Sequence, residues 1–288
     1  MSLGIITAFI AMICWGVGDF FIQKSARKIG DWQTLFLITL FGTVLLLPFV
    51  WTDLANFWEG INKTFFILMT AGGFLFVAAL LEFEALKEGK ISVIEPTWSM
   101  EIPTAAILAS LVLREVLGLN QIIFMVALIL GLVLVSYRGG KLDRKFFLEK
   151  GVPVSILAAL LMGGTNFFVG WGARETNPLV INFVISLFSL IGSSIFILIQ
   201  GKMKETFKHV ISYPKIVIPM MVLDNAAWIA FAIAMTVAPI GITVAISESY
   251  IIIAVLLGIF IGKEKLLKHQ YVGLVIALLA AIALSITI

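Results

Sequence analysis

The sequence predicts an all-α integral membrane protein with ten transmembrane helices in two inverted five-helix repeats. Three observations predict this fold class. Of the 288 residues, 61% are hydrophobic and only 13% are charged, with a mean hydropathy of +1.10, which is incompatible with a water-soluble surface. Apolar stretches long enough to cross a membrane occur ten times along the chain. The second half of the chain also repeats features of the first.

The ten predicted helices follow from length and hydropathy. A helix that crosses about 30 Å of hydrocarbon at about 1.5 Å per residue needs roughly 20 mostly apolar residues. The first stretch has no basic segment before it and is longer than a signal-peptide core, so we expect it to be a retained span. In order, the predicted helices cover residues 3–23, 32–52, 63–86, 91–113, 119–137, 151–172, 178–200, 215–237, 241–262 and 268–287.

The longest connection between predicted helices is basic and lies midway along the chain. It predicts a first five-helix repeat at residues 1–137, a connecting loop at 138–150 and a second repeat at 151–288. Because each half holds an odd number of spans, the second half must enter the membrane from the opposite side. Inverted repeats of this kind are typical of alternating-access transporters.

The two halves align with each other when the chain is shifted against itself. An offset of 147 residues places Asp19 on Asn166, and an offset of 149 residues places Glu115 on Glu264. Other matches between these two pairs keep the same order along the chain. The ordered set of matches indicates an internal duplication.

The distribution of basic residues predicts the orientation in the membrane. The odd-numbered connections hold 17 of the 20 Lys and Arg residues, whereas the even-numbered ones hold only Lys63, Arg114 and Arg174. Basic connections stay in the cytoplasm, so we expect the odd-numbered connections inside and both termini outside. The expected location is the plasma membrane, as a multi-pass protein.

Composition also excludes several kinds of site. The single cysteine, Cys14, excludes a disulfide and a thiolate metal cluster. Both histidines, His209 and His269, fall in loops or helix ends, which disfavours a transition-metal carrier. A net charge of +3 is too small for a nucleic-acid partner. We expect no cofactor and no metal, and the lipid bilayer and a small molecule as partners of a monomer or weak homodimer.

Seven acidic residues fall inside the predicted helices, whereas no lysine or arginine lies at the same depth. A charge at the membrane centre costs about 2.5–3.5 kcal/mol on insertion scales, so such residues usually face a cavity or a partner. Each must be protonated, hydrogen-bonded to a polar neighbour or paired with a mobile cation. The seven residues are Asp19, Glu82, Glu84, Glu95, Glu101, Asp224 and Glu248.

Depth along the helices separates these acids. Glu101, Asp224 and Glu248 lie about 10 to 15 Å into their spans, near the midplane. The others lie one or two turns from the inner ends, where lysines of the connections can reach them. Glu84 is expected to be structural. The remaining three, Asp19, Glu82 and Glu95, are candidate proton-coupling or gating residues.

Three tryptophans lie near the midplane on the same helix faces as acids. Trp15 precedes Asp19 by four residues, Trp98 precedes Glu101 by three, and Trp228 follows Asp224 by four. An acid beside an aromatic face suits an organic ammonium, through charge pairing and cation–π attraction. Packed or lipid-facing tryptophans explain the same spacing, so both interpretations remain open.

The fourth predicted helix carries the strongest local signal for a binding site. Pro96 and Pro103 flank Trp98 and Glu101, and each removes a backbone hydrogen bond. Irregular backbone at membrane depth is tolerated chiefly beside a cavity or protein. We therefore expect a central cavity whose substrate-binding residues are Trp15, Trp98, Glu101, Asn166, Asp224, Trp228 and Glu248.

The pattern resembles the drug/metabolite transporter superfamily, and within it the ten-span EamA-type permeases. The resemblance rests on the two five-helix halves, on Trp15-Gly16 in the first helix, and on Arg114-Glu115 and Lys263-Glu264 after the fourth and ninth helices. It implies a permease for amino acids or other small metabolites, with Glu115 and Glu264 as structural residues of the connections. Many relatives are drawn with cytoplasmic termini, opposite to the orientation that the basic residues predict.

Two further functions remain open. The string Gly16-Val17-Gly18-Asp19 resembles the catalytic motif of presenilin-type intramembrane aspartyl proteases, in which Asp224 would supply the second carboxyl. An exporter of organic cations or drugs would use the same acids as an importer of metabolites. The favoured prediction is a secondary transporter, not an enzyme, that moves a cationic or zwitterionic metabolite in exchange with or alongside protons.

Overall fold

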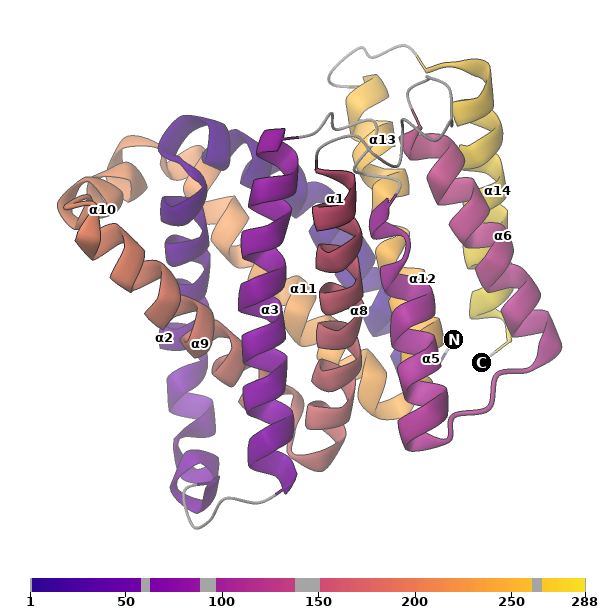
Figure 1. Cartoon of the computed structure of the whole chain (residues 1–288), viewed down its shortest axis with the longest axis horizontal. Coiled ribbons are helices and arrows are strands. Elements are labelled where there is room, and N and C mark those ends of the chain that lie inside the picture. Colours follow the sequence, from indigo (N-terminus) through magenta and orange to yellow (C-terminus); the bar gives the residue numbers. More distant parts are fainter. Residues whose placement is uncertain (1, 58–62, 89–96, 138–150, 261–265, 288) are drawn as a thin grey trace.

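The computed structural model describes residues 2–57, 63–88, 97–137, 151–260 and 266–287, and over these ranges the chain contains helices but no strand (Figure 1). The first half holds α1 (Leu3–Ile29), α2 (Asp31–Phe57), α3 (Lys63–Glu88), α5 (Glu101–Leu113) and α6 (Leu119–Ser136). The second half holds α8 (Val152–Glu175), α9 (Pro178–Ile199), α10 (Met203–Ser212), α11 (Pro214–Val237), α12 (Ile240–Glu248), α13 (Tyr250–Phe260) and α14 (Lys268–Ser285). Within the described ranges, nine segments are long and apolar enough to cross a membrane, and α5 is a shorter apolar helix.

Several helices are longer than the apolar stretches that predicted them. Helix α1 begins at a Ser2 cap, whose hydroxyl accepts the N–H of Ile5, and continues to Ile29 instead of residue 23. It ends at Gly30, whose φ of 96° favours glycine. The extra turns are largely polar. This shows that a helix can continue past the hydrocarbon. Hydropathy therefore marks the membrane-embedded part of a helix and not its end.

The fourth and ninth predicted helices are interrupted. Residues 97–98 are helical, 99–100 form a turn, and α5 starts at Glu101, as the flanking prolines led us to expect. The ninth predicted helix, at 241–262, is present as a span at Ile240–Leu257, but Ser249 divides it into α12 and α13. With the offset of 149 residues, Met100 aligns with Ser249 and Glu101 with Tyr250. Both repeats thus interrupt the same helix at the same place.

Helix α10 was not predicted. It occupies the connection between α9 and α11 and carries Lys204, Lys208 and His209. Its Thr206 is buried, and its Phe207 ring lies 5.8 Å from the Phe36 ring of α2. Ten residues are too few to span a membrane, so a search for apolar spans passes over such a helix.

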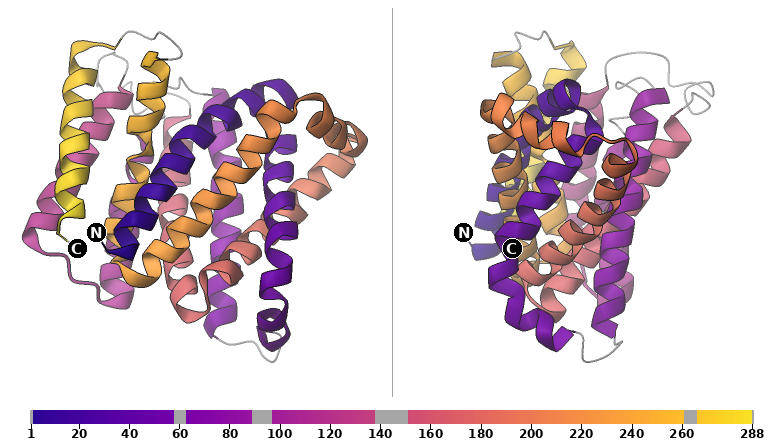
Figure 2. Two further views of the ribbon diagram at one scale, coloured as in Figure 1. Left: turned by 180° about the vertical axis from the view of Figure 1, so that it is seen from behind. Right: turned by 90° about the vertical axis from the view of Figure 1, so that its left-hand side faces the viewer.

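The packing of the helices follows the inverted repeat. Helix α1 packs along α11, and its repeat mate α8 packs along α3, the mate of α11 (Figure 2). In the same way α1 contacts α12 and α13, while α8 contacts α5. Helices α2 and α9 pair with each other, as do α6 and α14. Within the described residues, the contact of α1 with α11 is thus matched by that of α8 with α3, and the contact of α1 with α13 by that of α8 with α5.

Small residues bring α6 and α14 together. A Cβ added to Gly131 would lie 2.6 Å from the backbone nitrogen of Ala277, and one added to Gly273 would lie 2.6 Å from Leu134 Cβ. The Gln270 amide also donates to the Val135 carbonyl at 2.8 Å. These two helices correspond to the fifth and tenth predicted helices, which the repeat relates to each other. The oligomeric state stays a prediction.

Both termini lie at one end of the bundle, which we call the terminal end (Figure 1). The C-terminal ends of α5, α8 and α11 lie at the same end. This arrangement agrees with an even number of crossings. Which end faces the cytoplasm stays a prediction from the basic residues.

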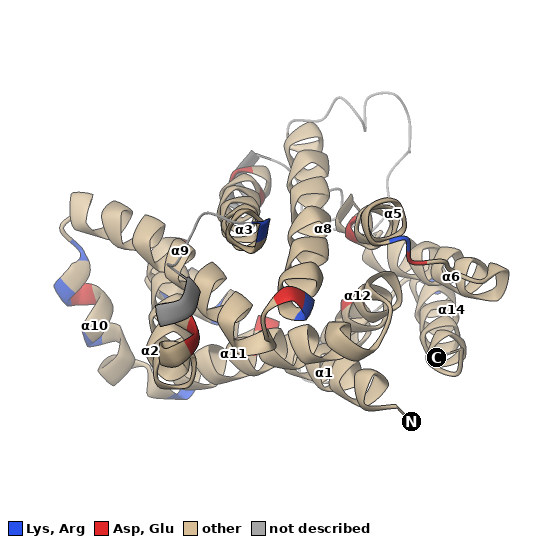
Figure 3. Cartoon of the chain, turned by 90° about the horizontal axis from the view of Figure 1, so that it is seen from below, with Lys and Arg blue, Asp and Glu red and all other residues tan. Residues whose placement is uncertain are grey.

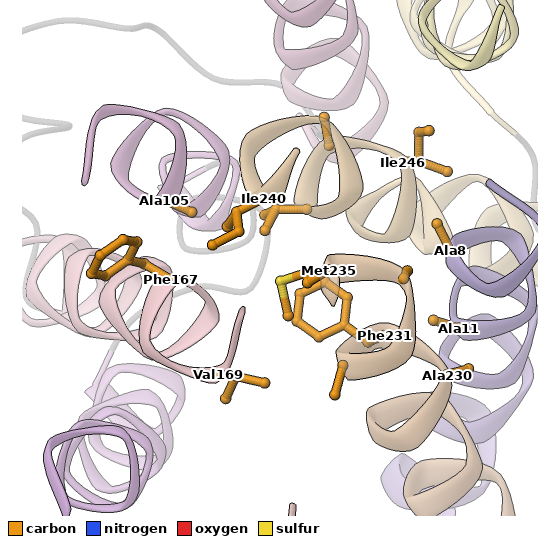
Figure 4. Packing of buried hydrophobic residues seen from close by; sticks show 14 of the residues in the cluster. Ala8, Ala11, Ala105, Phe167, Val169, Ala230, Phe231, Met235, Ile240 and Ile246 are labelled. Carbon is orange, nitrogen blue, oxygen red and sulfur yellow. The ribbon is translucent and has the colours of Figure 1, made fainter. Parts of the chain in front are cut away.

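Four buried apolar residues lie in the parts of α8, α11 and α12 that lead to the terminal end, and we call them the apolar layer: Phe167, Phe231, Met235 and Ile240 (Figure 4). All four side chains are buried, with exposures of 1% or less. A Cβ added to Gly170 would lie 2.7 Å from Ile240 Cδ1 and 2.9 Å from Met235 Sδ. Glycine at this position therefore lets α8 approach α11 and α12 closely.

Candidate functional site

Five carboxyl groups from five helices interact electrostatically, and we call them the acidic cluster: Asp19, Glu82, Glu101, Asp224 and Glu248. Glu82 of α3 interacts with Asp19, Glu101 and Glu248. Asp224 of α11 interacts with Asp19 of α1. Within the described ranges no lysine or arginine forms an ion pair with any of the five. When ionised, the five carboxyl groups therefore repel one another.

Burial differs within the acidic cluster. Glu101 and Glu248 are buried, with exposures of 6% and 9%, whereas Asp19, Glu82 and Asp224 are half-buried. Among the residues that the structure describes, no three acidic, histidine or cysteine side chains lie close enough to hold a metal ion.

Depth in the sequence had separated Asp19 and Glu82 from the midplane acids, and the structure does not keep that separation. Helices α1 and α3 continue to Ile29 and Glu88, beyond the ends of their apolar stretches. Both acids are therefore farther from the helix ends than the predicted boundaries implied. Glu84 is exposed, and Glu95 lies outside the described residues.

Glu101 is held by Asn166 of the second half. The Asn166 amide donates to Glu101 Oε2 at 3.2 Å, and its side chain is only 2% exposed. Gly163, three residues earlier on α8, makes this contact possible, since an added Cβ would lie 2.8 Å from the Glu101 carbonyl oxygen. Two residues that the sequence nominated separately thus meet across the two repeats.

Aromatic rings line one side of the acidic cluster. The Trp15 and Trp228 rings lie 5.2 Å apart, edge to face, and the Phe231 ring lies 5.0 Å from Trp15. Trp15 and Trp228, which the sequence nominated separately, are thus in contact. Trp98 does not join this group among the described residues, although its indole Nε1 is a buried donor without a hydrogen-bond partner there.

Tyr250 joins the aromatic rings to the acids, and sequence analysis missed it. Its ring lies 6.4 Å from Trp15, and its hydroxyl group interacts electrostatically with Asp19, Glu82, Glu101 and Glu248. Tyr250 is the first residue of α13, directly after the interruption at Ser249. Its alignment with Glu101 in the repeat was the signal that could have identified it.

Carboxyl groups and aromatic rings are together the groups that attract organic ammonium ions. The predicted central cavity around these residues stays a prediction. Glu101, Glu248 and Tyr250 lie directly at the two helix interruptions. Discontinuous helices commonly form the binding sites of transporters.

Comparison with known proteins identifies the family. The EamA-like transporter family model matches residues 2–137 and 149–286, once in each half. An uncharacterized protein of Methanocaldococcus jannaschii is 27% identical over 136 residues, which cover 98% of that protein and 47% of this chain. A crystal structure superposes with a TM-score of 0.76 at 12% identity, covering 97% of this chain and 95% of that one, which shows the fold alone. This multi-pass cell-membrane protein belongs to the EamA-like transporter family, and it transports small molecules and is not an enzyme.

Proposed function

We propose that the protein is a secondary transporter that moves a small organic cation or zwitterion, such as an amine or an amino acid, by alternating access with proton coupling. One observation carries this proposal: five carboxyl groups from five helices interact at membrane depth, with no basic partner among the described residues. Neutral sugars and organic anions do not require such a site.

The charge balance favours a cationic substrate. Acidic side chains inside a membrane are retained where a proton, water or a substrate neutralises them. A bound ammonium group neutralises the cluster, and the faces of Trp15 and Trp228 add cation–π attraction. For a zwitterion, the ammonium group lies near the acids and the carboxylate points away from them.

The same carboxyl groups provide proton coupling. A proton and an ammonium group compete for one cluster, so binding of one favours release of the other. The inverted repeats supply two conformations that open the site to alternate sides. Transport driven by a proton gradient then needs no further ionisable residue.

The test is transport by purified protein in proteoliposomes. Uptake and counterflow are measured for a panel of labelled amines, amino acids and sugars at two pH values. We expect saturable counterflow of an amine or amino acid, abolished by Glu101→Gln and by Asp224→Asn while the proteins remain folded in the membrane. Transport restricted to sugars or anions, or normal transport by both amide variants, contradicts the proposal.

Of the two alternative functions, the exporter stays open and the aspartyl protease does not. An exporter of organic cations or drugs uses the same site in the opposite direction, and inside-out vesicles with an imposed proton gradient distinguish the two directions. Asp19 and Asp224 do interact, as an aspartyl protease would need. Family membership nevertheless removes the protease alternative.

A further inference from the structure

Arg174 connects three helix ends at the terminal end of the bundle. Its Nη1 lies 2.6 Å from Glu115 Oε1, just after α5. Its Nε donates to the Met235 carbonyl at 2.7 Å and its Nη2 donates to the Ala238 carbonyl at 2.8 Å, at the end of α11. Figure 3, which views this end, shows basic and acidic positions together at the end of α8. One guanidinium thus links α8, α5 and α11.

Glu115 completes the connection from the first half. Its second oxygen, Oε2, accepts the N–H of Ile240, the first residue of α12, at 2.9 Å. Arg114 directs Glu115 toward this contact, since it ends α5 in a left-handed conformation with a φ of 57°. The side chains of Arg174 and Glu115 are 28% and 14% exposed. The ion pair is therefore partly buried and joins the two repeats.

The pair lies outside the apolar layer on the way to the acidic cluster. Along α11, Asp224 belongs to the cluster, Phe231 contacts Trp15, and Met235 provides a carbonyl to Arg174. Outside the pair is an open hollow of about 340 Å³, lined by Glu115, Val116, Arg174, Thr236, Val237, Ala238 and Pro239. The pair and the apolar layer together separate this hollow from the cluster.

We propose that Arg174 and Glu115 form a gate that closes the terminal end of the transport path. A substrate can reach the acidic cluster from this end only after α8 and α12 move away from the end of α5. That movement breaks the ion pair and the hydrogen bond to Ile240. The inference rests on the proposed transport by alternating access, but not on which substrate is carried.

The test measures conformation without any substrate. Cys14, the single cysteine, is replaced by serine, and Ala105→Cys introduces a reporter thiol in α5. Ala105 is fully buried near Ile240 (Figure 4), and it lies eight residues before the end of α5 at Leu113. A membrane-impermeant maleimide is then applied to each face of sealed vesicles in turn. The rate of labelling reports how often the terminal end opens.

Disrupting the pair should open this end. Arg174→Gln and Glu115→Gln should each raise the labelling rate from the terminal face by about tenfold. Arg174→Lys should give a smaller rise, because lysine keeps the charge but lacks the planar fork that serves Glu115 and two carbonyls. Labelling from the opposite face should fall in the same variants.

The matched control is Glu175→Gln, one residue away on α8. It removes the ion pair with Lys63, which also joins the two repeats at this end at 2.6 Å but is exposed. The labelling rate of this control should stay within about twofold of that of the reporter protein, because an exposed ion pair contributes little free energy. If one glutamine variant does not fold, the labelling rates of the other glutamine variant and of Arg174→Lys decide the test.

Labelling of Arg174→Gln or Glu115→Gln at the rate of the reporter protein overturns the gate. An equal rise in Glu175→Gln overturns it as well, because any loosened contact would then have the same effect. A transporter of sugars can still pass this test, so failure of the gate and failure of the proposed substrate class are distinguishable.

Discussion

Acidic residues occur both at the terminal end and in the acidic cluster, but their partners differ. At the terminal end Glu115 pairs with Arg174, Glu175 pairs with Lys63, and Asp53 accepts a hydrogen bond from Asn177 at 2.8 Å. In the acidic cluster the carboxyl groups face one another, and the hydrogen bond that relieves them comes from the neutral Asn166. Paired charges hold the two repeats together, whereas unpaired charges need a partner that comes and goes.

Energetics explain this difference. Removing one member of a buried charge pair is costly, so a paired acid keeps a structural contact in place. An acid without a counter-charge at membrane depth costs several kcal/mol and brings no structural gain. In our proposals the terminal end therefore sets which conformation is populated, and the acidic cluster sets what is bound.

After the two amide changes that abolish transport, the largest effect that we expect comes from Glu82, which interacts with three other acids. Glu82→Gln should lower substrate affinity by about thirtyfold or more, since losing one member of a buried charge pair costs at least about 2 kcal/mol. Its matched control is Glu84→Gln, two residues along α3 and exposed, which should transport normally. Counterflow titrations measure both. Equal effects of the two changes would place Glu82 outside the site.

Acidification should weaken substrate binding. At lower pH the five acids of α1, α3, α5, α11 and α12, which the neutral hydroxyl group of Tyr250 on α13 also faces, take up protons and lose their attraction for an ammonium group. Affinity should fall by about tenfold per pH unit where one proton competes with substrate. Binding to detergent-purified protein is measured between mildly acidic and mildly alkaline pH. Affinity that does not change with pH argues against proton competition.

The aromatic side of the site should have a moderate effect. Trp15→Phe keeps an aromatic ring but reduces the contact with Trp228, and should weaken binding by about tenfold, as expected for about 1 kcal/mol or more of cation–π attraction. Trp51→Phe, on a side chain that is 67% exposed, should have no effect. The two binding constants are compared in the same membrane preparation. Weakened binding in both would indicate a general effect of removing tryptophan.

Tyr250 should have a smaller effect. Tyr250→Phe keeps the ring beside Trp15 and removes the hydroxyl group that faces the acids. We expect a loss of affinity of about fivefold, the size of one hydrogen bond worth about 1 kcal/mol. Isothermal titration with the transported substrate measures it. An unchanged affinity would mean that the hydroxyl group does not contact the ligand.

The smallest effect should come from the exposed pair at the terminal end. Lys63→Gln should change the free energy of unfolding by about 1 kcal/mol or less, because the pair is largely solvated. Transport should stay normal. Thermal unfolding in detergent and counterflow check both points. A loss of transport here would mean that every contact between the repeats at this end controls opening.

Local signals in the sequence predicted some parts of the site and not others. Pro96 and Pro103 predicted the interruption before α5, because proline cannot donate a backbone hydrogen bond. No proline or glycine marks the interruption at Ser249, which only the repeat alignment could have suggested. The pair of Arg174 and Glu115 joins residues 59 positions apart that no local pattern connects.

The sequence by itself determined the membrane location, the helical spans, the duplication and the residue types near the midplane. These follow from hydropathy, periodicity and the cost of charge in hydrocarbon, each of which is a local property of the chain. The tertiary structure decided that Asp19 and Glu82 join the midplane acids, that Tyr250 bridges them to Trp15, and that Arg174 meets Glu115. Those pairings depend on how α1, α3, α8 and α11 pack, and packing depends on contacts between residues distant in the chain.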